Sequence, residues 1–165
     1  MKNFQHTRDE VFSALCESLW EHRALMAELA YHMRAQHSAS LSARFNDVET
    51  ATRQMISTEE RLVGAQMQVF HAMSQTSEHF PEVDPNMSLV EFAALLPDME
   101  QTILQDHISL YDEQIADLTQ AARLVASDSA QVLAVLGQSQ ETGGTYGRDG
   151  RRAGSRSAAG TRGVA

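Results

Sequence analysis

Seven histidines and 22 acidic residues are the side chains of this sequence that could bind a metal ion or move a proton. A di-iron site in a helical bundle needs a glutamate three residues before a histidine. No histidine of this sequence has one there, and no H-E-x-x-H motif occurs. Glu28 and His32 are four residues apart, and we interpret them as a solvated helix face rather than a metal site. A helical metal protein or enzyme built on His32, His37 or His71 is an alternative that metal analysis would test.

Nucleophilic chemistry has little support in this sequence. Cys16 is the single cysteine, so one chain cannot build a disulfide or a thiolate cluster. It lies near the apolar side of an amphipathic helical pattern, which favours a buried structural thiol over a reactive one. The segment GGTYGRDG, beginning at Gly143, lacks the lysine and the following helix of a phosphate-binding loop. We therefore expect no catalytic residue, no metal and no cofactor, and we do not expect an enzyme.

Charge is distributed unevenly along the chain. The net charge is −9, yet residues 143–165 contain five arginines against one aspartate, so the preceding part is more acidic than the total. An acidic body repels nucleic acid and anionic membranes. No apolar run approaches the roughly 18–20 residues that span a bilayer, and the start lacks the apolar core of a signal peptide. We expect a cytoplasmic protein with protein partners, no nucleic acid and no membrane insertion.

Helical periodicity then defines the elements that would position these residues. The first helix is predicted over about residues 8–40, with an apolar face at Phe12, Leu15, Leu19, Met26, Leu29 and Met33. A second helix is predicted from Asn46, as its cap, to about Ser77. Its seam reads Val48, Thr52, Met55, Glu59, Leu62, Gln66, Val69 and Met73. Half of these residues are polar or small, so the pattern predicts weak packing.

A loop with two prolines separates these helices from the rest. Ser88 and Glu91 have the spacing of a capping box before a short helix that ends at Pro97. The third long helix is predicted from Asp98 to Leu136, ended by Gly137. The fold class is therefore all-α, an elongated antiparallel bundle of three long helices plus one short helix. We expect a bundle domain over residues 1–137 and a flexible, disordered tail rich in Gly, Arg and Ser over residues 138–165.

Apolar surface on the third long helix exceeds what one packed side can use. Both flanks of its second half carry apolar or small residues: Leu118, Ala121, Ala122, Leu124, Val125, Ala126, Val132, Leu133, Val135 and Leu136. Two interpretations stay open. The helix is buried on two sides, in its own bundle or in a homodimer, or one face is left for another protein's amphipathic helix.

The order of these motifs resembles the FlgN family of flagellar export chaperones, over about residues 8–150. The quoted features are LWEHRALMAEL…AQHSASL, a break, ETATRQMISTEERL, the proline loop, SLVEFAALLP, a long helix and GTYGRDGR. SLVEFAALLP is similar to the family's short Ser-Leu-x-Glu-Leu helix, and GTYGRDGR to its Thr-Tyr-x-x-x-Gly ending. One departure is that QAARLVASDSAQ replaces the asparagines common in the middle of the family's last helix.

The resemblance implies a function without catalysis. Such chaperones hold the amphipathic C-terminal helices of hook-filament junction (hook-associated) proteins, prevent their premature assembly and deliver them to the flagellar type III export gate. The cargo-binding face would be Leu118, Ala122, Val125, Val132 and Leu136. Tyr146 matches the tyrosine that docks on the export gate, where a large ring with one hydroxyl suits a binding hot spot. The alternative is a self-associating coiled-coil scaffold or adaptor, such as a homodimer.

Overall fold

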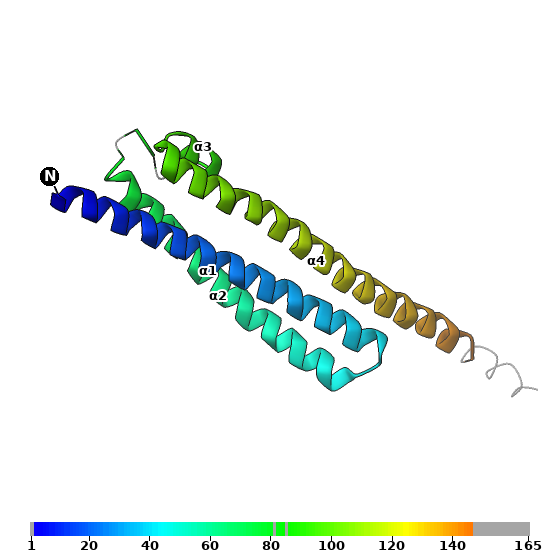
Figure 1. Ribbon diagram of the computed structural model, residues 1–165. Coiled ribbons are helices and arrows are strands. Elements are labelled where there is room, and N and C mark those ends of the chain that lie inside the picture. Colours follow the sequence, from blue (N-terminus) through cyan, green and yellow to red (C-terminus); the bar gives the residue numbers. More distant parts are fainter. Residues whose placement is uncertain (1, 81, 85, 147–165) are drawn as a thin grey trace, which may run out of the picture. The chain divides into compact units, whose positions relative to one another are not determined.

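The computed structural model describes residues 2–80, 82–84 and 86–146, with side-chain surroundings for residues 7–134 of that range (Figure 1). Four helices follow one another: α1 (Lys2–Leu41), α2 (Phe45–Ser77), α3 (Leu89–Ala94) and α4 (Asp98–Tyr146). No strand occurs in the described ranges, and the predicted all-α fold of three long helices and one short helix is confirmed. The chain divides into two units, Met1–Ala126 and Ser127–Ala165. The boundary predicted after residue 137 stays a prediction.

A tight turn makes an antiparallel hairpin of α1 and α2, which pack closely along their length (Figure 1). The Arg44 N–H donates to the Ala39 carbonyl at 3.0 Å, and the Ala43 N–H donates to the Ser40 carbonyl at 3.1 Å. This pair of bonds is a Schellman motif, in which the residue after the C-cap has a left-handed backbone conformation. Ala43 takes that place with φ 53°, although glycine would fit it without steric cost.

The start of α2 differs from the sequence prediction. The helix begins at Phe45, its N-cap is Arg44, and no side chain caps it. Asn46 already lies inside the helix, where its carbonyl accepts a hydrogen bond from Thr50 Oγ1 at 2.9 Å. The Schellman turn carries the chain directly from one helix into the next, so the predicted Asn46 cap is wrong. The first helix also starts at Lys2, earlier than predicted.

Small side chains form the face that α2 buries. Ala51, Thr58, Ala65 and Ala72 recur every seven residues and are 1–5% exposed. They lie one position before the predicted seam residues Thr52, Glu59, Gln66 and Met73, and of these only Met73 is buried. The predicted seam is therefore rotated by one residue. Small residues let two helix backbones approach closely, and this close packing of α1 and α2 decides which face of α2 is buried.

A core of bulky apolar residues gathers where α3 meets the first half of α1, the start of α4 and the end of α2. Phe92 and Leu104 are fully buried there, beside Phe12, Leu15, Leu19, Met73, Phe80, Val83 and Leu96. The predicted capping box of α3 is confirmed, because Ser88 Oγ accepts from the Glu91 N–H and Glu91 accepts from the Ser88 N–H. Arg8 closes the edge, with its guanidinium 4.2 Å from the Phe80 ring centre and 2.6 Å from Glu100 Oε1.

α4 continues beyond its predicted end. It passes through Gly137 and ends at Tyr146 as one helix. A single glycine costs a helix only about 1 kcal/mol relative to alanine, so it does not end a helix alone. The predicted stop at Gly137 is therefore wrong. Within the described ranges, no helix is both long enough and apolar enough to cross a membrane.

Candidate binding groove and its surroundings

An apolar groove of about 320 Å³ lies within the first unit, lined by the middle of α1, the second half of α2, the short α3 and the first half of α4. Its apolar walls are Leu19 from α1, Val69 from α2, Leu89 and Val90 from α3, and Ile108 and Ile115 from α4. Val90 and Ile115 are 60% and 51% exposed, so apolar surface stands open to solvent at the groove's rim. Ligand pockets in proteins are usually about 300–1,000 Å³ and mostly apolar. This groove is at the small end of that range, with room for a few side chains.

A satisfied polar pair forms part of the groove wall. Tyr111 Oη lies 3.3 Å from the Leu19 carbonyl oxygen and 3.0 Å from His22 Nδ1. The hydroxyl has one proton, so when it donates to Leu19 it must accept from a protonated His22 Nδ1. Burial raises the pKa of Tyr111 to about 12, against the opposing charge of Arg23. Burial also lowers the pKa of His22. Both rings are thus neutral near pH 7, and the Tyr111 hydroxyl has both of its partners within the chain.

The contact between α1 and α4 beside this groove is polar and incompletely hydrogen-bonded. Arg23 Nε and Nη1 and His107 Nδ1 are buried and have no hydrogen-bond partner among the described residues. Burial first, and then the charge of Arg23, lower the pKa of His107, while Asp106 opposes them. Further along, Arg34 Nη1 and Asp117 Oδ1 pair at 2.7 Å with both side chains largely exposed. Unmade hydrogen bonds cost stability, so this contact holds α4 less firmly than the apolar core does.

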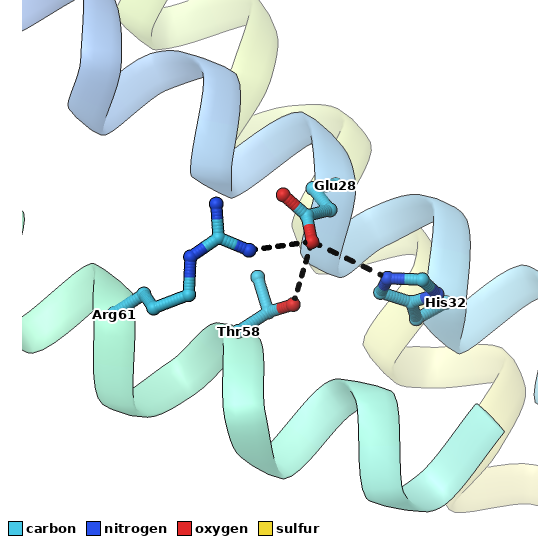
Figure 2. A network of polar contacts seen from close by, with 4 residues as sticks. All are labelled: Glu28, His32, Thr58 and Arg61. Carbon is cyan, nitrogen blue, oxygen red and sulfur yellow. Dashed lines mark hydrogen bonds and ion pairs between the residues drawn. The ribbon is translucent and has the colours of Figure 1, made fainter. Parts of the chain in front are cut away.

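A second polar cluster ties α1 to α2 and involves the Glu28 and His32 pair (Figure 2). One carboxylate oxygen, Glu28 Oε1, accepts from Thr58 Oγ1 at 3.1 Å and from Arg61 Nη1 at 2.9 Å. His32 Nε2 lies 3.6 Å from the same oxygen. Desolvation would raise the pKa of Glu28, but the hydrogen bonds from Thr58 and Arg61 and the charge of Arg61 lower it overall. The cluster is an interhelical tie.

The interpretation of this pair as a solvated face is wrong for His32, which is 9% exposed. The other two histidines of the metal alternative lie apart from it. His37 is half-buried later on α1, and His71 is exposed on α2. In the part of the chain that the structure describes, no three His, Cys, Asp or Glu side chains are grouped closely enough to hold a metal ion. Cys16 is half-buried against the core, and desolvation by burial, followed by the charge of Glu17, raises the pKa of its thiol.

The predicted cargo-binding residues are placed unequally. Leu118 and Val125 are half-buried, Ala122 is exposed, and Val132 is 59% exposed. The side chains of Leu136 and Tyr146 lie outside the described residues, although the backbone of both belongs to α4. Steps of four, three and seven residues place Leu118, Ala122, Val125 and Val132 on one face of a helix. Nothing in the structure tests a role for these residues in binding.

Sequence reasoning missed the groove that precedes this face. Ile108, Tyr111 and Ile115 belong to the predicted apolar face of the third long helix, but their neighbours Val69, Leu89 and Val90 come from distant segments. The sequence predicts α3 itself from its capping box, its apolar helical face and the following Pro97. Its position beside α2 and α4 has no counterpart in the local pattern.

Comparison with known proteins adds no relatives: no family model, curated protein or solved structure matches this chain. The resemblance to flagellar export chaperones therefore rests on the order of the sequence motifs alone.

Proposed function

We propose that this protein is a cytoplasmic flagellar export chaperone without catalytic activity. It binds the amphipathic C-terminal helices of hook-associated proteins, keeps them from assembling early and delivers them to the export gate. The observation that carries the proposal is the apolar surface left open on α4, where Ile115, Val132 and Leu133 are 51%, 59% and 69% exposed. An amphipathic helix from a partner covers such a surface by placing residues at i, i+3, i+4 and i+7 against it.

The proposed cargo-binding face is Leu118, Ala122, Val125, Val132 and Leu136. Tyr146 is the proposed contact with the export gate. It is the last residue of α4, immediately before the arginine-rich segment. Arginines there suit steering toward an acidic partner surface.

Substitution at Val132 tests the binding face. Val132→Asp places a charge on an exposed position of the face, so folding is retained while binding is lost. Ala134→Asp is the matched control, because Ala134 is exposed and lies on the opposite side of the same helix turn. We expect a hook-associated C-terminal peptide to bind the parent chain and the Ala134→Asp variant with similar affinity. Its affinity for the Val132→Asp variant should be at least about tenfold lower. Equal binding by all three would reject this face.

Hydrogen exchange tests the proposal independently of any substitution. Cargo binding should slow exchange of α4 amides between about residues 115 and 146, because a bound helix reduces local opening. Unchanged protection throughout that range in a saturated complex would contradict the proposal. Tyr146→Ala should leave cargo affinity and folding intact while export falls.

Self-association is a second candidate, favoured by a different surface. Ile56, Val63, Met67 and Phe70 are 50–64% exposed, and their spacing of seven, four and three residues aligns them on one stripe of α2. Two copies of the chain could cover the stripe as a coiled coil. Sedimentation at several concentrations separates the two functions, because a scaffold stays dimeric on dilution and loses its dimer with Val63→Asp.

A further inference from the structure

The charge around the apolar groove specifies the partner that the groove accepts. Among the groove's lining residues Asp112 is the one that carries a formal charge, and no lysine or arginine lines it. Asp112 is exposed and forms no ion pair within the described residues. From its start to Ala122, α4 has no lysine or arginine, and its carboxylates are Asp98, Glu100, Asp106, Asp112, Glu113 and Asp117.

Two of these carboxylates are already paired within the chain. Glu100 pairs with Arg8, and Asp117 pairs with Arg34. Asp112 has no such ion pair, and it lies beside the exposed Ile115. An apolar surface and an unpaired negative charge therefore share one edge of the groove. A partner that buries Ile115 without supplying a positive charge would leave Asp112 partly desolvated and unpaired, which costs free energy.

The apolar part of the groove specifies the partner's other side. The Tyr111 hydroxyl has the Leu19 carbonyl and His22 Nδ1 as partners within the chain, and the exposed Gln66 is the other uncharged polar residue that lines the groove. A volume of about 320 Å³ accepts a few apolar side chains, and the open rim at Val90 and Ile115 lets them enter from a helix lying across it. The partner therefore presents apolar residues in one stripe.

We propose that this groove seats an amphipathic helix of another protein whose apolar stripe is flanked by lysine or arginine. Ile115 and Val90 contact the stripe, and Asp112 pairs with one flanking cation. By helical spacing the groove leads along α4 to Leu118 and Ala122, so one partner helix can occupy both. The inference deepens the proposed function and rests on it in one respect, that this protein binds a partner's helix.

The test uses two fluorescent synthetic peptides of about 18 residues, long enough to form a helix on binding. Both have leucine at i, i+3, i+4 and i+7, and they differ only in lysine or glutamate on the flanks. Binding to the full chain is followed by fluorescence anisotropy. We expect the lysine peptide to bind at least about tenfold tighter than the glutamate peptide at ~0.05 M salt, with a smaller ratio at ~0.5 M.

Variants of the full chain locate the site. Ile115→Ser should weaken the lysine peptide about tenfold, Val90→Ser less, and Ile115→Leu little, since the first two remove apolar contact area from exposed positions. Asp112→Asn should weaken it about threefold, as one partly exposed ion pair allows. Asp106→Asn is the matched control, six residues earlier and off the groove, and should have no effect.

Three outcomes would overturn the inference: equal affinity for both peptides, no loss with Ile115→Ser, or equal losses with Asp106→Asn and Asp112→Asn, which would indicate general attraction to an acidic protein. Failure of the flagellar assignment is distinguishable from these. In that case hook-associated peptides would not bind, while the lysine peptide would still bind and respond to Ile115→Ser.

Discussion

The two ends of the α1–α2 hairpin are packed by different kinds of residue. Near α3, bulky side chains such as Phe12, Phe80 and Phe92 form one apolar core with the start of α4. Toward the turn, the buried residues of α2 are Ala51 and Thr58, and polar ties such as the Glu28 cluster join the helices. Burial stabilises roughly in proportion to apolar area, so the bulky core at the α3 end contributes more than the small residues that α2 buries toward the turn. There, Leu25, Met26 and Leu29 of α1 supply the larger buried side chains.

The difference shows how one chain combines a firm fold with open apolar surface. Because the core near α3 anchors the start of α4, contacts farther along α4 need not be strong. They include an exposed ion pair, Arg34 with Asp117, and the buried Ala121. Apolar residues such as Ile115 are left partly uncovered. A partner can therefore bind there without the fold depending on those residues.

The largest expected effect comes from Phe92→Ala. Phe92 is fully buried in the core, and removing such a ring costs about 3–5 kcal/mol of unfolding free energy through lost burial and a residual cavity. Urea unfolding followed by circular dichroism measures it. Val90→Ala, two residues earlier on α3 and mostly exposed, is the control and should cost no more than about 0.5 kcal/mol. A Phe92→Ala loss below about 1 kcal/mol would remove the distinction between the two ends.

A smaller effect is expected from breaking the polar tie. Glu28→Ala leaves the hydroxyl of Thr58, a residue only 1% exposed, without its acceptor across the interface, at a cost of about 1–2 kcal/mol. Glu21→Ala removes an exposed carboxylate from the same helix and should cost less than about 0.5 kcal/mol. If Glu28→Ala destabilises as much as Phe92→Ala, the hairpin's far end is as important to stability as the core.

The smallest effect is a dependence of stability on pH. The pKa values of His22 and His107 are lowered by burial, so folding favours their neutral rings. Their contribution is complete above the unfolded pKa of about 6.5 and is lost as pH falls through the range between that value and the lowered one. Glu28, whose pKa is also lowered, begins to lose its contribution only below about 4.5, at a lower pH than that at which the histidines begin to lose theirs.

We therefore expect the urea midpoint to decrease between about pH 7.5 and pH 5.5. His107→Gln should reduce this decrease, whereas His71→Gln, which removes an exposed ring, should leave it unchanged. A decrease that responds equally to both substitutions would mean that the α1–α4 contact is not its source.

Much of this molecule follows from its sequence alone. Apolar periodicity and the scarcity of glycine and proline before residue 137 determine three long helices, because local backbone preference and an amphipathic face agree there. The α3 helix is equally local, since Ser88 and Glu91 satisfy each other's backbone N–H groups within four residues. The start of α4 after Pro97 was predicted for the same reason.

Tertiary structure decided the rest. Periodicity locates an apolar stripe but does not show how closely the neighbouring helix approaches, and close packing of α1 and α2 selected Ala51, Thr58, Ala65 and Ala72 over the larger residues of the predicted seam. The left-handed Ala43 turn, the burial of His32 and the groove beside α3 also depend on segments far apart in sequence. A local pattern reports the preferences of one helix, whereas this groove exists only once four helices have packed.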